Sequence, residues 1–385
     1  PPPPPPLPPP PLFFLMIRRP PRSTLERSAA ASDVYKRQTY MGKPLETVLD
    51  PILNIPWREL GAIQRAARLD GKWHVLIELG YPVEGLTSAY AVALQTWMED
   101  EIVLELKFRP PASRALPGAS NVIAIASGKG GVGKATTAVN LAVALDRAGA
   151  KAGILDADIY GPSQGIMLGI REGQRPEIRN ENQFVPIRCH GIEAISMSML
   201  VTDKTPMVWR GPMASGALQQ LLQQTAWSEL DYLIVDMPPG TGDIQLTLSQ
   251  QVSVGGAVII TTPQEIALAD ARKGIEMFRK VSVPIIGVVE NMSYFVCDGC
   301  DRKHRLFGGG GGERVASEYG TSLLGEFPLD PVIREQTDAG VPIVAMDNTS
   351  PMSSLYLDCA RRMAAALWLI SRDKAPTPTL SRDDQ

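Results

Sequence analysis

Five short apolar runs divide residues 121–290, and each is followed by a longer stretch with the spacing of an amphipathic helix. Runs rich in Val and Ile, without polar alternation, are typical of parallel strands that are buried on both faces. This pattern predicts an α/β fold with a doubly wound, mainly parallel sheet, whose ligands bind at the carboxyl ends of the strands. The runs are NVIAIAS (121–127), KAGILD (151–156), DYLIVD (231–236), GAVIITT (256–262) and VPIIGVVE (283–290).

A glycine-rich segment, GKGGVGKATT (128–137), follows the first run and opens a helical pattern. Glycines allow backbone N–H groups to surround phosphate oxygens, Lys134 neutralises the outer phosphates, and the helix presents its positive end. Because a strand precedes it and a helix follows it, the segment predicts a nucleoside triphosphate site. Its residues are Gly128, Lys129, Gly130, Gly131, Val132, Gly133, Lys134, Ala135 and Thr136.

One position in this loop departs from the general rule. The Ser or Thr that normally follows the loop lysine and coordinates Mg²⁺ is Ala135 here. Thr136 carries a hydroxyl, but one residue further along a helix turns it by about 100°. The sequence therefore predicts ATP binding with a weakened Mg²⁺ site and impaired hydrolysis.

Carboxylates follow two further strands. Carboxylates beside a triphosphate hold Mg²⁺ and position the attacking water, so we assign Asp236 to the metal and Asp158 to the water, with Asp156 in support. Gly240, in the loop DMPPGTGD, would let the backbone approach the γ-phosphate. Asn291 follows the fifth run, where an asparagine could equally be a turn residue.

The pair Cys297 and Cys300 lies just beyond this strand. A C-x-x-C turn places two thiolates on one centre, and sulfur favours zinc or an iron-sulfur cluster. Both centres need four ligands, the sequence contains no second C-x-x-C, and a homodimer would supply four thiolates. The pattern alone leaves open a redox dithiol and a half zinc site that uses His304.

Residues 121–366 resemble the Mrp (ApbC) family of iron-sulfur cluster carrier ATPases, within the MinD/ParA-like class of deviant P-loop proteins. The resemblance implies a homodimer in which Lys129 reaches the nucleotide of the partner subunit. The segments that carry it stand in family order: SGKGGVGK, LDADIYGPS, MVWRGPMAS, DYLIVDMPPGTGDIQLTLSQ, ENMSYFVC-x-x-C and PLDPVIRE.

The same resemblance implies further roles. Asn291 would pair with the adenine edge, and Cys297 and Cys300 of each subunit would bridge a labile 4Fe-4S cluster. ATP binding or hydrolysis, with Lys129, Lys134, Asp156 and Asp158 as catalytic residues, would govern cluster loading or transfer. The implied partners are cluster scaffold proteins and apo iron-sulfur proteins. The chain departs from the family at Ala135 and in a longer glycine run, Gly308–Gly312.

Composition limits the rival functions. A net charge of -3 and a pI near 5.8 argue against nucleic acid and acidic membrane surfaces as partners. Four cysteines in 385 residues indicate a reducing compartment, hence the cytoplasm, and no apolar run is long enough to span a bilayer. One rival is a MinD-like or ParA-like positioning switch that binds a membrane or DNA, and MinD-like proteins end in a basic amphipathic membrane helix. The helical pattern 353–370 instead has an ordinary core face of Leu355, Met363, Leu367 and Leu369. A zinc-stapled nucleotide-binding scaffold is the other rival.

The N-terminal part divides into three segments. Residues 1–40 are proline-rich at the start and then resemble translated adapter sequence, so we expect an assembly artefact upstream of Met41. The native start is then expected to be Met41 or to be missing from the sequence. A disordered proline-rich arm is the alternative. Residues 41–109 predict a small α/β domain, a degenerate relative of the assembly domain fused ahead of Mrp proteins. Its expected elements are a helix 56–68, a strand 73–79, a helix 88–97 and a strand 102–108. A linker at 110–120, the ATPase domain at 121–372 and a polar tail at 373–385 complete the predicted organisation.

Overall fold

A computed structural model describes most of the chain after the proline-rich segment. The segment 1–38, Met41, Asp243 and the tail beyond Lys374 lie outside the described residues, and so do two parts of the family segments, 207–210 and 246–250. None of the helices in the described part of the chain has both the length and the apolar character that a membrane span requires. The described residues are 39–40, 43–95, 97, 101–111, 115–159, 161–180, 182–200, 211–242, 245, 253–347 and 349–374.

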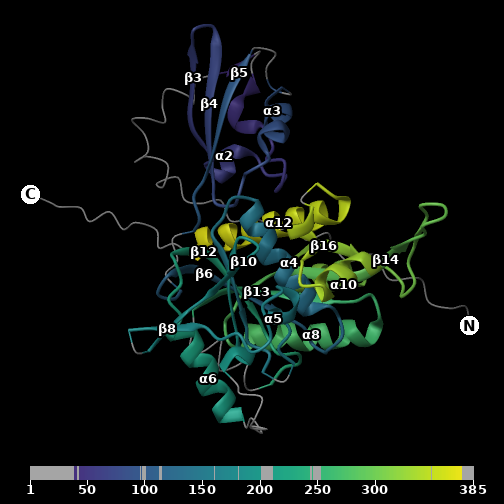
Figure 1. The fold of residues 1–385 in the computed structure, drawn as a ribbon. Coiled ribbons are helices and arrows are strands. Elements are labelled where there is room, and N and C mark those ends of the chain that lie inside the picture. The colour runs from purple at the N-terminus through teal and green to yellow at the C-terminus, as the bar shows by residue number, and fades with distance from the viewer. Residues whose placement is uncertain are drawn as a thin grey trace, which may run out of the picture.

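A nine-stranded sheet forms the centre of residues 119–328 (Figure 1). Its order is β10-β11-β7-β12-β6-β13-β14-β15, and β16 also pairs with β14. All neighbouring pairs are parallel except β10–β11 and β14–β15, which confirms the predicted mainly parallel sheet. The strands are β6 (Ala119–Ala126), β7 (Ala152–Asp156), β10 (Ile187–Cys189), β11 (Ile192–Ser196), β12 (Leu230–Asp236), β13 (Val254–Thr261), β14 (Ile285–Val296), β15 (Lys303–His304) and β16 (Ser322–Pro328).

Helices cover both faces of this sheet, as a doubly wound fold requires. Helices α4 and α12 contribute buried side chains to one hydrophobic core, and α6, α8 and α9 contribute to the other. The helices are α4 (Lys134–Arg147), α5 (Gln164–Met167), α6 (Gly211–Gln224), α8 (Glu265–Lys280), α9 (Gly311–Tyr319), α10 (Pro331–Asp338), α11 (Ile343–Met346) and α12 (Pro351–Lys374). Smaller elements are the strand pairs β1 (Thr39–Tyr40) with β2 (Lys43–Pro44) and β8 (Glu177–Arg179) with β9 (Gln183–Val185), and the 3-10 turn η3 (Met197–Leu200).

The N-terminal module, residues 43–108, is built on a three-stranded sheet of order β3-β4-β5 (Figure 1). The predicted helix 56–68 is wrong beyond Leu60, where Gly61 adopts a left-handed conformation and ends α2. A bulge in β3 makes its buried residues Ile63 and Ala66 three positions apart, which imitates helical spacing. The predicted strands 73–79 and 102–108 are confirmed, and the predicted helix 88–97 is confirmed as far as Gln95. The elements are η2 (Leu45–Thr47), α2 (Trp57–Leu60), β3 (Ile63–Leu69), β4 (Lys72–Leu79), α3 (Thr87–Gln95) and β5 (Ile102–Phe108).

Helix α12 lies between the N-terminal module and the large sheet (Figure 1). A guanidinium nitrogen of Arg361, a buried residue of α12, donates to the backbone oxygen of Glu84 at 2.7 Å. Gly80 lies so close to Trp368 that a Cβ there would be 2.1 Å from the indole ring. The predicted core face of the last helix is confirmed at Met363 and Leu367, which are fully buried.

A buried cluster of one carboxylate and two phenols stabilises the N-terminal module. The Tyr81 hydroxyl lies 2.6 and 2.7 Å from the two carboxylate oxygens of Asp50, and Tyr90 donates to the same carboxylate at 2.5 Å. The backbone N–H groups of Ile52 and Leu53 also donate to Asp50. All three polar side chains of the cluster are at most 1% exposed. Because a buried carboxylate needs hydrogen-bond donors, the cluster holds together the three chain segments that contain Asp50, Tyr81 and Tyr90.

Tyr81→Phe is expected to lower the free energy of unfolding of the module by about 2 kcal/mol, the cost of removing a donor from a buried charged acceptor. The measurement is a urea titration followed by tryptophan fluorescence, since Trp57 stacks on Tyr90 at 5.7 Å. An unchanged midpoint would contradict the role given to the cluster.

Candidate functional site

A cleft of about 200 Å³ opens where β6 ends and α4 begins. This is the edge at which the sequence predicted a ligand, because the parallel strands end there. Gly131 and Gly133 adopt positive φ angles of 79° and 80°, which lets the loop turn its backbone toward the cleft. The cleft is lined by Ser127, Lys129, Gly130, Gly131, Gly133, Lys134, Ala135, Thr136, Asp158, Gly161, Ser163, Met167 and Pro239.

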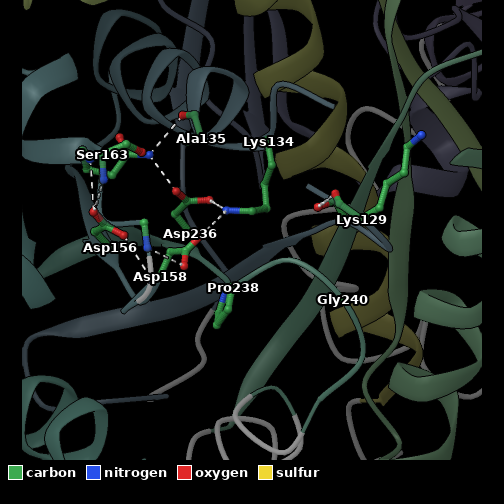
Figure 2. A network of polar contacts seen from close by, with 12 residues as sticks. Lys129, Lys134, Ala135, Asp156, Asp158, Ser163, Asp236, Pro238 and Gly240 are labelled. Atoms are coloured by element: carbon green, nitrogen blue, oxygen red, sulfur yellow. Dashed lines mark hydrogen bonds and ion pairs between the residues drawn. The ribbon is translucent and has the colours of Figure 1, made fainter. Parts of the chain in front are cut away.

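Lys134 is paired with carboxylates at the base of this cleft (Figure 2). Its Nζ lies 2.5 Å from Oδ1 of Asp236 and 4.0 Å from Oδ2 of Asp158. Burial raises the pKa of Asp236, and the neighbouring Lys134 ammonium opposes that shift. The ammonium therefore neutralises a fully buried carboxylate. Lys129 lines the cleft, is half-buried and points away from this pair (Figure 2).

Gln164 is a site residue that sequence reasoning missed. Its side-chain nitrogen donates to Oδ2 of Asp236 at 2.8 Å and to the backbone oxygen of Ala135 at 3.0 Å. Both acceptors are oxygens, so the orientation of the amide is fixed by its partners. With Lys134 on the other oxygen, both oxygens of Asp236 are held. No general motif marks Gln164; its only signal is that it follows Ser163 in the loop after Asp158.

Asp156 has a structural place in the site. One of its oxygens accepts from the Asp158 N–H, and the other accepts from the Ser163 and Gln164 N–H groups and from the Ser196 hydroxyl, at 3.0 to 3.1 Å. Burial and the nearby Asp236 carboxylate raise the pKa of Asp156 to about 7. Asp156 is fully buried and is not among the lining residues, so it orients the loop that carries Asp158.

The remaining loop residues have different surroundings. A Cβ on Gly128 would be 2.2 Å from the backbone of Asp270, so this glycine allows α8 to pack closely. The Val132 side chain is buried, and its backbone oxygen accepts from the Asn291 side-chain amide at 2.9 Å. Gly240 donates its N–H to the Ser127 oxygen at 2.9 Å, which holds the DMPPGTGD loop against the cleft.

The residues present fit a triphosphate well and a magnesium ion in part. A Cβ on Gly130 or Gly131 would meet no atom within 4 Å, so the loop has open space on its ligand side. Helix α4 begins at Lys134, and its first N–H groups point toward the same space. For Mg²⁺, Asp158 offers an oxygen in the lining of the cleft, whereas Ala135 offers none from its side chain. Asp236 is buried, and its oxygens are engaged by Lys134 and Gln164, so it could offer an oxygen only if Lys134 moved away.

The two cysteines occupy the turn between β14 and β15, which projects at the right of Figure 1. The turn is closed by backbone hydrogen bonds: the Cys297 N–H donates to Arg302 at 3.0 Å, and the N–H groups of Cys300 and Asp301 donate to Cys297. The Gly299 N–H and the Cys300 thiol lower the pKa of Cys297. Two sulfurs thus face one another on an exposed turn, and the pKa of one of them is lowered.

The surroundings of this pair weigh against two of the alternatives. The turn follows a strand and does not begin a helix, where a redox dithiol is activated. Among the described residues, no group of three or more His, Cys, Asp and Glu side chains is arranged to hold a metal ion, which leaves the half zinc site with His304 without support. Burial raises the pKa of Cys189 to about 11 and that of Cys359 to about 12, so these thiols are poor ligands.

Comparisons with protein families, known proteins and solved structures find relatives that agree with one another in kind. The ParA family model described as NUBPL iron-transfer P-loop NTPase matches residues 118–364. An iron-sulfur cluster carrier protein of Pseudomonas fragi is 60% identical over 252 residues, which is 65% of this chain and 88% of that protein. One from Deinococcus radiodurans is 43% identical over 342 residues, 87% of this chain and 97% of that protein. A solved nucleotide-binding protein in complex with ADP from Archaeoglobus fulgidus is 35% identical with a TM-score of 0.54, covering 63% of this chain and 93% of its own.

Proposed function

The chain belongs to the ParA-group family of NUBPL iron-transfer P-loop NTPases, and we propose that it is an ATP-binding carrier that assembles a labile iron-sulfur cluster and delivers it to apo-proteins. The observation that carries the proposal is the pair Cys297 and Cys300, two facing thiols on an exposed turn. Thiolates are the usual ligands of such clusters, and exposure lets a cluster be passed on.

The nucleotide roles follow from the contacts in the cleft. The loop N–H groups and α4 bind the phosphates, and Lys134 leaves Asp236 to neutralise the outer phosphates. Mg²⁺ would be held by Asp236, with Asp158 nearby, and would supply positive charge to the transferring phosphoryl group. Asp158, 14% exposed and lining the cleft, orients the attacking water. Gln164 and Asp156 keep these groups in place.

The cluster site is completed by a second copy of the chain. One turn supplies two thiolates, and a 4Fe-4S cluster takes four, so two turns bridge one cluster with about two iron atoms per chain. Lys129 extends away from its own Lys134–Asp236 pair, in keeping with a role at the nucleotide of the partner subunit (Figure 2). Gel filtration of the iron-loaded and iron-free chain tests the homodimer.

The partners we propose are cluster scaffold proteins as donors and apo iron-sulfur proteins as acceptors. A membrane- or DNA-bound positioning ATPase is disfavoured, since the apolar face of α12 packs into the core and the net charge is negative. Four free cysteines support a reducing compartment such as the cytoplasm.

Anaerobic reconstitution tests the proposal directly. The full chain is incubated with iron, sulfide and a reductant, desalted, and assayed for iron, sulfide and visible absorption. We expect broad visible absorption, about two iron atoms per chain and loss of both on transfer to an apo-protein. Zinc retention with no iron uptake would favour a zinc-stapled scaffold and would refute the carrier function.

A further inference from the structure

Strand β14 is common to the nucleotide cleft and the cysteine turn. Its first half pairs with β13 and β16 inside the large sheet, and its last residues lead into the turn that holds Cys297 (Figure 1). Between these halves, Asn291 contacts the phosphate loop. Any change in the middle of β14 therefore lies between the two sites.

The middle of β14 is an irregular segment, residues 291–293. Glu290 pairs with Glu326 of β16, and the next aligned pair is Tyr294 with Pro328. Between these two pairs, β14 advances by four residues and β16 by two, so β14 has two extra residues here. Pairing with β13 also ends at Glu290. We call this segment the β14 bulge.

Met292, at the centre of the β14 bulge, has a φ of 54°. A left-handed conformation costs a non-glycine residue roughly 1 kcal/mol or more and persists only where neighbouring contacts maintain it. Those contacts are with the phosphate loop. Asn291 donates to the Val132 oxygen at 2.9 Å, and a Cβ on Gly133 would be 2.1 Å from the Asn291 side-chain nitrogen.

Hydrogen bonds flank the β14 bulge on both sides. The Ser293 hydroxyl lies 2.6 Å from Oε1 of Glu290 and 2.9 Å from Oε1 of Glu326, and Glu290 accepts from the Gly312 N–H at 2.6 Å. Beyond it, the Leu329 N–H donates to the Tyr294 oxygen at 2.7 Å. Because Glu290 is held inside the sheet, a change of conformation at Asn291 and Met292 is passed on toward Ser293 and Tyr294, on the side of the cysteine turn. Side chains along a strand alternate between the two faces of the sheet. Two extra residues in β14 therefore leave the side chains beyond the β14 bulge on the faces that they would occupy without it.

We propose that the β14 bulge links the occupancy of the phosphate loop to the geometry of the Cys297–Cys300 turn, with Asn291 and Met292 as positioning residues. This inference rests on the proposed function. A nucleotide that draws Asn291 away from Val132 removes the contact that keeps Met292 left-handed. Met292 then relaxes toward an extended conformation, and the strand leading to Cys297 is displaced.

The test measures the alkylation rates of Cys297 and Cys300 in the cluster-free full chain, with and without saturating ATP in EDTA. Iodoacetamide labelling is quantified peptide by peptide with mass spectrometry. In the wild-type chain we expect ATP to change the rate constant threefold or more. Met292→Gly, which relieves the left-handed strain, should shift the ratio of the two conformations about fivefold and suppress the response. Met292→Val should give the ATP-bound rate without ATP.

Ser282→Gly is the matched control, since Ser282 is an exposed turn residue with a φ of 59° at the other end of β14. It should respond to ATP like the wild type. An unchanged alkylation rate in a wild-type chain shown to bind ATP would overturn the inference, and so would identical alkylation rates of the two Met292 variants in the absence of ATP. The carrier function is tested by a separate measurement, the iron content of the reconstituted wild-type chain. A chain that takes up no iron refutes the carrier function, whatever the alkylation rates are.

Discussion

Cys297→Ser is expected to reduce the iron content of the reconstituted chain from about two atoms to the background level. A serine oxygen is a poor ligand for the iron of such a cluster, and one lost thiolate per chain removes two of the four sulfurs in the dimer. The turn itself should survive, because its closing hydrogen bonds run between backbone atoms of Cys297, Cys300 and Arg302. Iron analysis and visible absorption, with circular dichroism for the fold, measure this. Cys300→Ser should behave in the same way.

Cys189→Ser is the matched control for this experiment. Cys189 is half-buried on β10, and its raised pKa keeps it protonated at neutral pH. The control should retain the iron and absorption of the wild type. Iron loss in Cys189→Ser would show that the ligand set is incomplete, and full absorption in Cys297→Ser would refute the assignment of the turn.

The sheet was predictable from sequence because each buried parallel strand is a continuous apolar run. Four strands of the large sheet escaped this rule. The segments of β10, β11, β15 and β16 are short or interrupted by charged residues such as Glu193 and Glu326. Glu193 is buried only because Ser228 and Arg188 donate to it. Such pairings are made across the chain, so a local pattern does not reveal them. The glycine run Gly308–Gly312 is a similar case: Gly312 packs against Glu290, where a Cβ would lie 2.9 Å from the Glu290 Cβ.

The parts of the candidate site whose residues are close together in the sequence were predictable. The phosphate loop and the cysteine turn are each contained in one short segment, and both were located from their spacing. The roles of Gln164 and of the β14 bulge were not predictable, since both depend on contacts between distant segments. Asp156 shows the same limit: spacing placed it beside the metal site, but its oxygens are engaged by the loop that follows it.

Ala135→Ser is expected to raise the Mg²⁺-dependent ATPase rate on the order of a hundredfold. Ala135 lines the cleft at the first turn of α4, so a serine hydroxyl there reaches the space beside the phosphates. The backbone of Ala135 is already fixed by the Gln164 amide, which also holds Asp236. The added hydroxyl oxygen would therefore act together with the Asp236 carboxylate, which is already held in place. ATP affinity should change little, because the loop N–H groups and Lys134 are unaltered.

Steady-state phosphate release at saturating ATP, with Mg²⁺ varied, separates this effect from binding. Thr136→Val is the matched variant, since Thr136 also lines the cleft and carries the nearest alternative hydroxyl. If Ala135 limits hydrolysis, Ala135→Ser raises kcat and lowers the Mg²⁺ concentration for half-maximal rate, whereas Thr136→Val leaves the low rate of the parent chain unchanged. Equal rates in the parent chain and Ala135→Ser, together with loss of activity in Thr136→Val, would mean that Thr136 supplies the missing ligand and that hydrolysis is not impaired.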